Sequence, residues 1–204
     1  MRTRLWLPAL GIVGLSVVPV ILLLDQPAAH ACAALPRGLQ AVARAVSLLA
    51  SLPVALGAAL AMVALYFIRR RTGSAGRHLL SVPAAAISAW LLTMLLKVVF
   101  GRYRPELFLT QGLYGFSFFK AGYWFNSFPS GHAATAFGFL AAIGNVRPRW
   151  RWPLLALATV IAASRVVMCA HFPADVMAGA VVGSGCALLF TRIIAGPRTN
   201  RQED

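Results

Sequence analysis

The sequence predicts an all-α protein that crosses a membrane with six helices. Of the 204 residues, 59% are hydrophobic and only 12% are charged, whereas a soluble domain carries about a quarter charged residues. Apolar runs near the roughly 20 residues that a bilayer requires recur along the chain. Each run must be helical, because in lipid only a helix satisfies its backbone hydrogen bonds within one segment.

The apolar runs divide the chain into six expected helices, the fourth of which is the shortest and should begin a few residues earlier. The sequence shows no repeat, no low-complexity linker and no sign of a second domain, so residues 1–204 are expected to form one transmembrane domain. The expected helices are Leu5–Leu24, Val46–Ile68, Leu79–Phe100, His132–Val146, Pro153–Cys169 and Ala174–Ile194.

The basic residues predict how the chain is oriented. The net charge of +14 would also suit a nucleic-acid binder, but here the basic residues form short clusters between apolar runs instead of one solvated face. The expected partner is therefore the bilayer and not nucleic acid. Twelve of the basic residues fall on one side of a six-helix topology, which the positive-inside rule makes cytoplasmic together with both termini. They are Arg2, Arg4, Arg69, Arg70, Arg71, Arg77, Arg147, Arg149, Arg151, Arg192, Arg198 and Arg201.

The N-terminus and the cysteines each leave two interpretations open. A basic start, an apolar stretch and small-x-small triplets resemble a signal peptide, but the stretch is longer than a signal core, which favours an uncleaved helix. Cys32 is expected in a loop, Cys169 near a helix end and Cys186 inside an apolar run. None has metal-site spacing, so we expect idle thiols; a Cys32–Cys169 disulfide is the alternative.

Three polar clusters interrupt the apolar pattern, and all three map to the outer face. In "KVVFGRYRP", Lys97 and Arg104 lie seven residues apart and would share one face of a continuing helix. By itself this stretch could be two cations that reach from a helix end toward water. Arg102 is basic and close to both, but no role can be assigned to it.

The second cluster, "PSGH", opens the fourth helix. Ser130 suits an N-cap, and Gly131 lets the backbone approach a ligand closely. The free N–H groups and the dipole of the helix start favour an anion, which His132 could reach. The plainer alternative is a capped helix with a polar histidine at the interface.

The third cluster, "SRVVMCAHFPAD", links the last two helices. Arg165 lies near the end of the fifth helix, and Asp175 follows His171 by four residues. The carboxylate could accept a hydrogen bond from that imidazole and orient it as a nucleophile; a structural Asp–His pair is the alternative. Together the clusters would gather two imidazoles, a carboxylate and three cations, which suits a transferring phosphoryl group. They include no carboxylate cluster for a divalent metal.

These residues resemble the three signature motifs of the type 2 phosphatidic acid phosphatase (PAP2) family, in order and without a departure. The motifs are Lys97-x6-Arg104-Pro105, Pro129-Ser130-Gly131-His132 and Ser164-Arg165-x5-His171-x3-Asp175. The resemblance implies a PAP2-like helical core and a phosphatase that uses no metal or other cofactor. It also implies that His171 is the nucleophile, oriented by Asp175, and that His132 is the acid and base. Lys97, Arg104, Ser130, Gly131 and Arg165 would bind the substrate phosphate.

The implied substrate is a lipid phosphate or diphosphate at the periplasmic face of a bacterial inner membrane. Undecaprenyl diphosphate or phosphatidylglycerophosphate is preferred, with a lipid A phosphate close behind. A protein that binds or transports a lipid phosphate without hydrolysing it is the alternative, although binding alone would not need the His132–His171–Asp175 set. The aromatic loop from Glu106 to Phe128 is expected to form an interfacial belt, a lip for lipid entry, or both. The sequence says nothing of oligomeric state.

Overall fold

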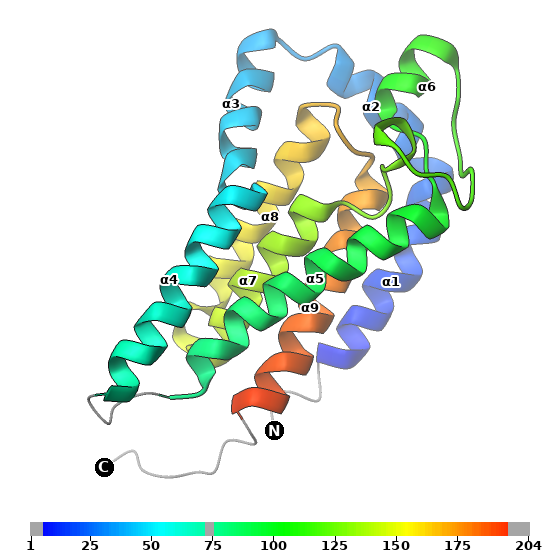
Figure 1. The fold of residues 1–204 in the computed structure, drawn as a ribbon. Helices are drawn as coiled ribbons and strands as arrows, with labels where there is room; N and C mark the ends of the chain where they lie inside the picture. Colours follow the sequence, from blue (N-terminus) through cyan, green and yellow to red (C-terminus); the bar gives the residue numbers. More distant parts are fainter. Residues whose placement is uncertain (1–5, 72–75, 196–204) are drawn as a thin grey trace.

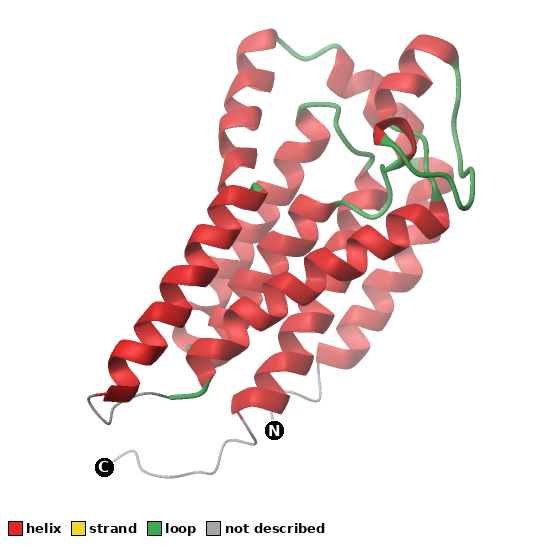
Figure 2. Cartoon of the chain, in the orientation of Figure 1, coloured by secondary structure: helices red, strands yellow, loops and turns green. Residues whose placement is uncertain are grey.

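The computed structural model describes residues 6–71 and 76–195, and all named elements in these ranges are helices (Figure 2). Short 3-10 turns at Leu48–Ala50, Tyr123–Phe125 and Pro148–Trp150 accompany the α-helices. The prediction of an all-α fold is confirmed. The α-helices are α1 (Trp6–Leu23), α2 (Asp25–Ala33), α3 (Arg37–Ser47), α4 (Leu52–Arg71), α5 (His78–Phe100), α6 (Pro105–Gln111), α7 (Gly131–Val146), α8 (Arg151–Val167) and α9 (Pro173–Ala195).

The expected number of membrane-spanning helices is approximately right. Within the described residues, four helical runs are long and apolar enough to cross a bilayer, and a fifth is possible if α1 and α2, bent by 65°, form one span. The second expected span lies inside a 35-residue run, Arg37–Arg71, in which α3 continues into α4. The fourth corresponds to α7, whose 16 residues reach only about 24 Å, short of the hydrocarbon thickness of about 30 Å.

Helix α7 is short because it lies inside the bundle. It packs against α5, α8 and α9 (Figure 1), and its buried positions are small residues, among them Ala133, Ala134, Gly138 and Ala142. Small side chains let neighbouring helices approach closely, which is how helices associate in a membrane. The surroundings of α7 are thus largely protein, so it need not match the bilayer thickness.

The closest approach to α7 comes from two glycines of α9, one turn apart. A Cβ atom on Gly179 would lie 2.5 Å from the backbone oxygen of Ser130, and one on Gly183 would lie 2.3 Å from that of Ala134. Both are backbone contacts, which cannot move aside as a side chain would. These glycines therefore set the distance between the two helices that carry the PSGH and HFPAD segments.

We expect Gly179→Ala and Gly183→Ala each to destabilise the protein, because overpacking of a tight contact costs about 1–3 kcal/mol. Gly185→Ala is the matched control on the same helix, because a Cβ there meets nothing within 4 Å. Thermal unfolding in detergent measures the difference. Equal melting temperatures for Gly179→Ala and Gly185→Ala would contradict this packing.

Two expectations about the polar segments are wrong. Cys32 lies in a helix and not in a loop, because the chain continues after α1 as α2. Asp25 stands in the first turn of α2, where its negative charge is stabilised by the positive end of the helix dipole. The connection after α5 is also not a plain loop, since α6 occupies Pro105–Gln111.

The cysteines are free thiols in this structure; Cys169 Sγ lies 3.8 Å from the backbone oxygen of Ala29.

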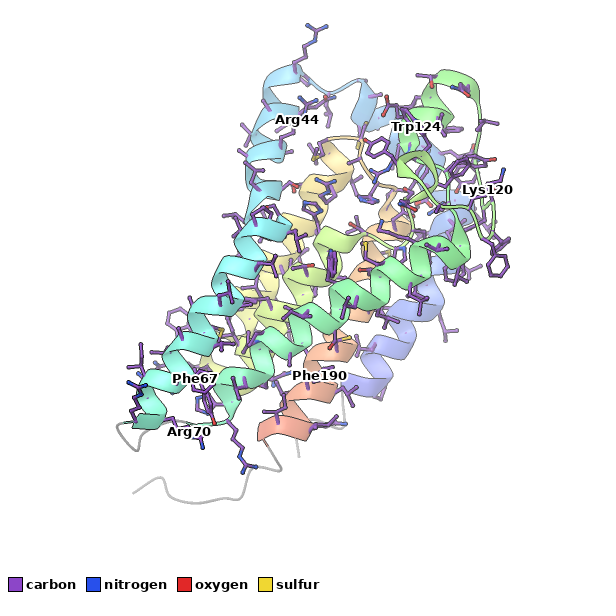
Figure 3. The ribbon with its side chains drawn as sticks, in the orientation of Figure 1. Arg44, Phe67, Arg70, Lys120, Trp124 and Phe190 are labelled. Atoms are coloured by element: carbon purple, nitrogen blue, oxygen red, sulfur yellow. The ribbon has the colours of Figure 1, made fainter. Side chains whose placement is uncertain are left out.

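The two ends of the bundle are formed by different parts of the chain. Helix α1 begins and α9 ends toward the lower end of Figure 1, whereas α2 and α6 lie at the upper end and α7 and α9 begin in the upper half, below them. Figure 3 shows Phe67 and Arg70 at the lower end and Arg44, Lys120 and Trp124 at the upper end. The three predicted clusters all lie toward the upper end, as expected.

Candidate active site

The starts of α7 and α9 are joined by a hydrogen bond. The backbone N–H of Ser130, immediately before α7, donates to the backbone oxygen of Asp175 in the first turn of α9, at 2.9 Å. Helix α9 begins at Pro173, a residue well suited to a first helical position. Since each helix start carries a partial positive charge, this junction is a favourable place for an anion.

His171 stands beside Asp175 at this junction. The distance from His171 Nδ1 to Asp175 Oδ2 is 3.6 Å, a contact longer than a hydrogen bond, and both side chains are buried. Asp175 Oδ2 also accepts bonds from Ser127 Oγ at 2.6 Å and from the Phe172 N–H at 2.9 Å. These donors hold the carboxylate in place, so Nδ1 faces Asp175 and the other ring nitrogen, Nε2, is left for chemistry.

The environment keeps His171 neutral at physiological pH. Burial lowers the pKa of His171 to about 3, although the neighbouring Asp175 acts in the opposite direction. Lys97 and Arg104 add to the lowering. The unprotonated form, which has a free lone pair, is therefore present above about pH 3, as a nucleophile requires.

Lys97 and Arg104 are held by groups without charge. Lys97 Nζ donates to the backbone oxygen of Asn126. Arg104 donates to the backbone oxygens of Tyr123 at 2.8 Å and of Ala170 at 3.1 Å. Burial lowers the pKa of Arg104, but a guanidinium remains protonated at neutral pH. Both side chains are fixed, and neither positive charge is neutralised by a contact.

Arg165 follows the same pattern on α8. Its guanidinium donates to Ser47 Oγ at 2.6 Å and lies 3.3 Å from Met168 Sδ. Among the described residues, Arg102 forms salt bridges with two aspartates, whereas the contacts of Lys97, Arg104 and Arg165 are with uncharged groups. Three oriented cations without a carboxylate partner thus remain for an anionic ligand.

His132 and Gly131 complete the set that the motifs predicted. A Cβ on Gly131 would lie 3.9 Å from Lys97 Cε, which places the start of α7 against the end of α5. His132, the next residue, lies within electrostatic range of Arg165, Lys97 and Arg104. The structure therefore brings the three sequence clusters together, although they come from α5, α7 and the α8–α9 connection.

Ser130 occupies the N-cap position of α7, as predicted, but its side chain does not cap the helix. Ser130 Oγ is buried and has no hydrogen-bond partner among the described residues. A buried hydroxyl without a partner is unfavourable unless a ligand supplies one, and a phosphate oxygen would. Within the described part of the chain, no group of three or more His, Cys, Asp or Glu side chains could hold a metal ion.

Sequence reasoning missed three polar side chains next to Asp175. Ser127 bonds to it directly, and the unassigned Arg102 bridges it to Asp25 with two contacts of 2.6 Å. The sequence did contain a signal for Asp25. It is one of five acidic residues in the chain and lies at the end of an apolar run, and an ionisable residue in such a segment is a functional candidate by default. Ser127 carried no such signal.

The aromatic loop separates into a packed part and an exposed part. Phe116 and Phe128 pack against Phe100 with ring centroids 5.9 and 5.1 Å away. In contrast, a second group of aromatic side chains is exposed, and Figure 3 shows one of them, Trp124, at the upper end of the bundle. This group comprises Phe118, Phe119, Tyr123 and Trp124. The arrangement suits contact with the membrane interface, where amphipathic aromatic rings are favoured.

The fold defines a helical integral membrane protein, and the grouped histidines and cations form a candidate anion site in it. The model of the PAP2 superfamily matches residues 78–198, more than half of the chain. The chain belongs to the PAP2 superfamily, as the motif resemblance predicted.

Two curated relatives and two solved structures show how far the similarity extends. Lipid A 1-phosphatases of Rhizobium johnstonii and Rhizobium etli are each 40% identical over 105 residues; the match covers 52% of this chain and 43% and 45% of those proteins. The chain thus matches less than half the length of these relatives. Aquifex aeolicus LpxE is 23% identical, with a TM-score of 0.60 and coverage of 78% and 88% of the two chains. The PAP2 type phosphatidylglycerolphosphate phosphatase of Bacillus subtilis is 20% identical, with a TM-score of 0.64 and coverage of 95% and 98%. Both structures share the fold.

Proposed function

We propose that this protein is a phosphatase that hydrolyses a membrane lipid phosphate through a phosphohistidine. The observation that carries the proposal is the group of three cations, Lys97, Arg104 and Arg165, fixed by uncharged acceptors around two histidines. Such fixed positive charges stabilise the oxygens of a transferring phosphoryl group. Ser130 Oγ and the Gly131 N–H would complete the binding site.

The reaction proceeds in two displacements. His171 Nε2 attacks phosphorus and forms a P–N bond while the P–O bond to the lipid breaks and His132 donates a proton to the departing oxygen. Water then attacks the phosphohistidine, His132 removes a proton from it, and the P–N bond breaks to release phosphate and the free imidazole. Asp175 holds His171 through its Nδ1 side and stabilises the positive charge that develops on the ring.

The substrate is proposed to be a bacterial envelope lipid that carries a phosphate or diphosphate. Identity of 40% to two lipid A 1-phosphatases makes a lipid A 1-phosphate the first candidate, ahead of the sequence preference for phosphatidylglycerophosphate or undecaprenyl diphosphate. Phosphate release from a panel of these purified lipids, with His171→Ala as the control, tests the proposal. Tight binding of a lipid phosphate without release from any panel member would favour the binding or transport protein instead.

The proposed reaction uses no metal, because three protein cations take the place of a divalent ion at the phosphoryl oxygens. Activity should therefore survive an excess of EDTA and be inhibited by vanadate, which mimics five-coordinate phosphorus. The measurement is phosphate release before and after chelation. Loss of activity with EDTA and its return with added Mg²⁺ would contradict this mechanism.

We further propose that the chain lies in a bacterial inner membrane with the site facing the periplasm and both termini in the cytoplasm. In a variant whose three cysteines are replaced by serine, a single cysteine at exposed Gly112 should react with a membrane-impermeant thiol reagent on intact cells. A cysteine at Arg149, exposed at the opposite end, should react only after lysis. The reverse pattern would overturn the orientation. The single transmembrane domain remains a prediction.

A further inference from the structure

A buried charge network lies behind the proposed nucleophile. Arg102 Nη1 contacts Asp175 Oδ1 and Arg102 Nη2 contacts Asp25 Oδ2, each at 2.6 Å, and all three side chains are fully buried. Three aromatic rings enclose the guanidinium with centroids 4.7–5.4 Å from its carbon. They belong to Phe172, Phe116 and Tyr114. A buried ion pair is unfavourable to break, since removal of one partner leaves an uncompensated charge.

The network ties the N-terminal helices to the start of α9. Asp25, in the first turn of α2, accepts a hydrogen bond from the backbone N–H of Ala174 at 3.0 Å. Tyr114 Oη donates to the backbone oxygen of Ile21 on α1 at 2.6 Å and accepts a bond from Arg102 at 3.0 Å. Asp25 therefore contacts Arg102, which is a direct partner of Asp175, and the backbone of Ala174, the residue before Asp175.

With both carboxylates ionised, the charges of the network add to −1, from two carboxylates and one guanidinium. Burial by itself would lower the pKa of Arg102, but Asp175 and Asp25 raise it above its ordinary value, so the guanidinium stays charged. Without Asp25, Arg102 would cancel the charge of Asp175. With Asp25 present, one net negative charge remains beside His171, whose ring becomes positive as it attacks phosphorus.

We propose that Asp25 is a positioning residue of the active site. Its negative charge offsets the positive charge of Arg102, so that the negative charge of Asp175 remains available to His171. The proposal deepens the phosphatase function proposed above and rests on it. Asp25 touches no substrate atom in this scheme. Its effect reaches the reaction through Arg102 and Asp175, and it belongs to the phosphoryl-transfer step and not to lipid binding.

The test is the rate of phosphoenzyme formation, measured by rapid quench with radiolabelled nitrophenyl phosphate on the full-length protein in detergent. Asp25→Asn keeps the size of the side chain and an acceptor for the Ala174 N–H but changes the network charge from −1 to 0. We expect the rate to fall about 10- to 100-fold, the loss that is typical when the hydrogen-bond partner of a metal-ligating histidine is removed, with KM little changed. Glu106→Gln is the matched control, because it removes an exposed carboxylate from the same end of the bundle.

A double variant separates charge from mere structure. Asp25→Asn with Arg102→Met returns the network to −1, so it should form phosphoenzyme faster than Asp25→Asn; a purely structural role would make it slower. If Asp25→Asn does not fold, the double variant alone decides, and a rate within about tenfold of the native protein is expected. A native rate in Asp25→Asn, or a double variant slower than Asp25→Asn, would overturn the inference. Absence of phosphoenzyme in the unmodified protein would instead overturn the proposed function.

Discussion

His171→Ala is expected to abolish turnover and every trace of acid-labile phosphoenzyme. The reason is that His171 supplies the only electron pair that forms the bond to phosphorus in the proposed reaction. Loss of a nucleophile commonly lowers kcat by more than about 10⁴-fold. The measurement is a rapid quench with radiolabelled substrate, followed by acid and base treatment of the denatured protein, because phosphohistidine survives base and not acid.

The Asp175→Asn variant is the companion to this experiment. It keeps the nucleophile but removes the charge that stabilises the ring, so phosphoenzyme should still form, only more slowly, from a lipid phosphate and from an activated ester alike. His78→Ala serves as the control, since His78 opens α5 at the opposite end of the bundle. Phosphoenzyme at native yield in His171→Ala would mean that another residue is the nucleophile.

The helices and the motif residues could be predicted because each depends on local sequence. An apolar run of about 20 residues has only one stable form in lipid, and a helix start that binds an anion needs particular residues at adjacent positions. Thus the sequence located α5, α8, α9 and the residues around His132 and His171. It also placed the three cations at one end.

The bend between α1 and α2 and the enclosure of α7 by other helices could not be predicted, because both depend on contacts between distant segments. Asp25 is held by Arg102 and by the N–H of Ala174, and α7 is enclosed by helices from both halves of the chain. A hydropathy pattern records how apolar a segment is, and not whether lipid or protein surrounds it. The same limit applies to Arg102. Lys97 and Arg104 lie close to it in the sequence, so the sequence alone could not distinguish Arg102 from these phosphate-binding cations. The distinction lies in its partners, which are carboxylates.

His132→Ala is expected to fail mainly where the leaving group is poor. A lipid alkoxide departs readily only if it is protonated as the P–O bond breaks, and a positioned general acid typically contributes about 10²–10⁴-fold. A nitrophenolate leaves without such help. Turnover of a lipid phosphate should therefore fall by about that factor, while phosphoryl transfer from nitrophenyl phosphate to His171 falls far less.

The same variant should accumulate phosphoenzyme, because hydrolysis of the P–N bond requires His132 to remove a proton from water. A burst of nitrophenol equal to the amount of enzyme, followed by slow turnover, is the expected time course. The control is Ser130→Ala, which should weaken phosphate binding for both substrates without a dependence on the leaving group. Phosphoenzyme that is trapped in His171→Ala and never in His132→Ala would show that the two histidines have the opposite roles.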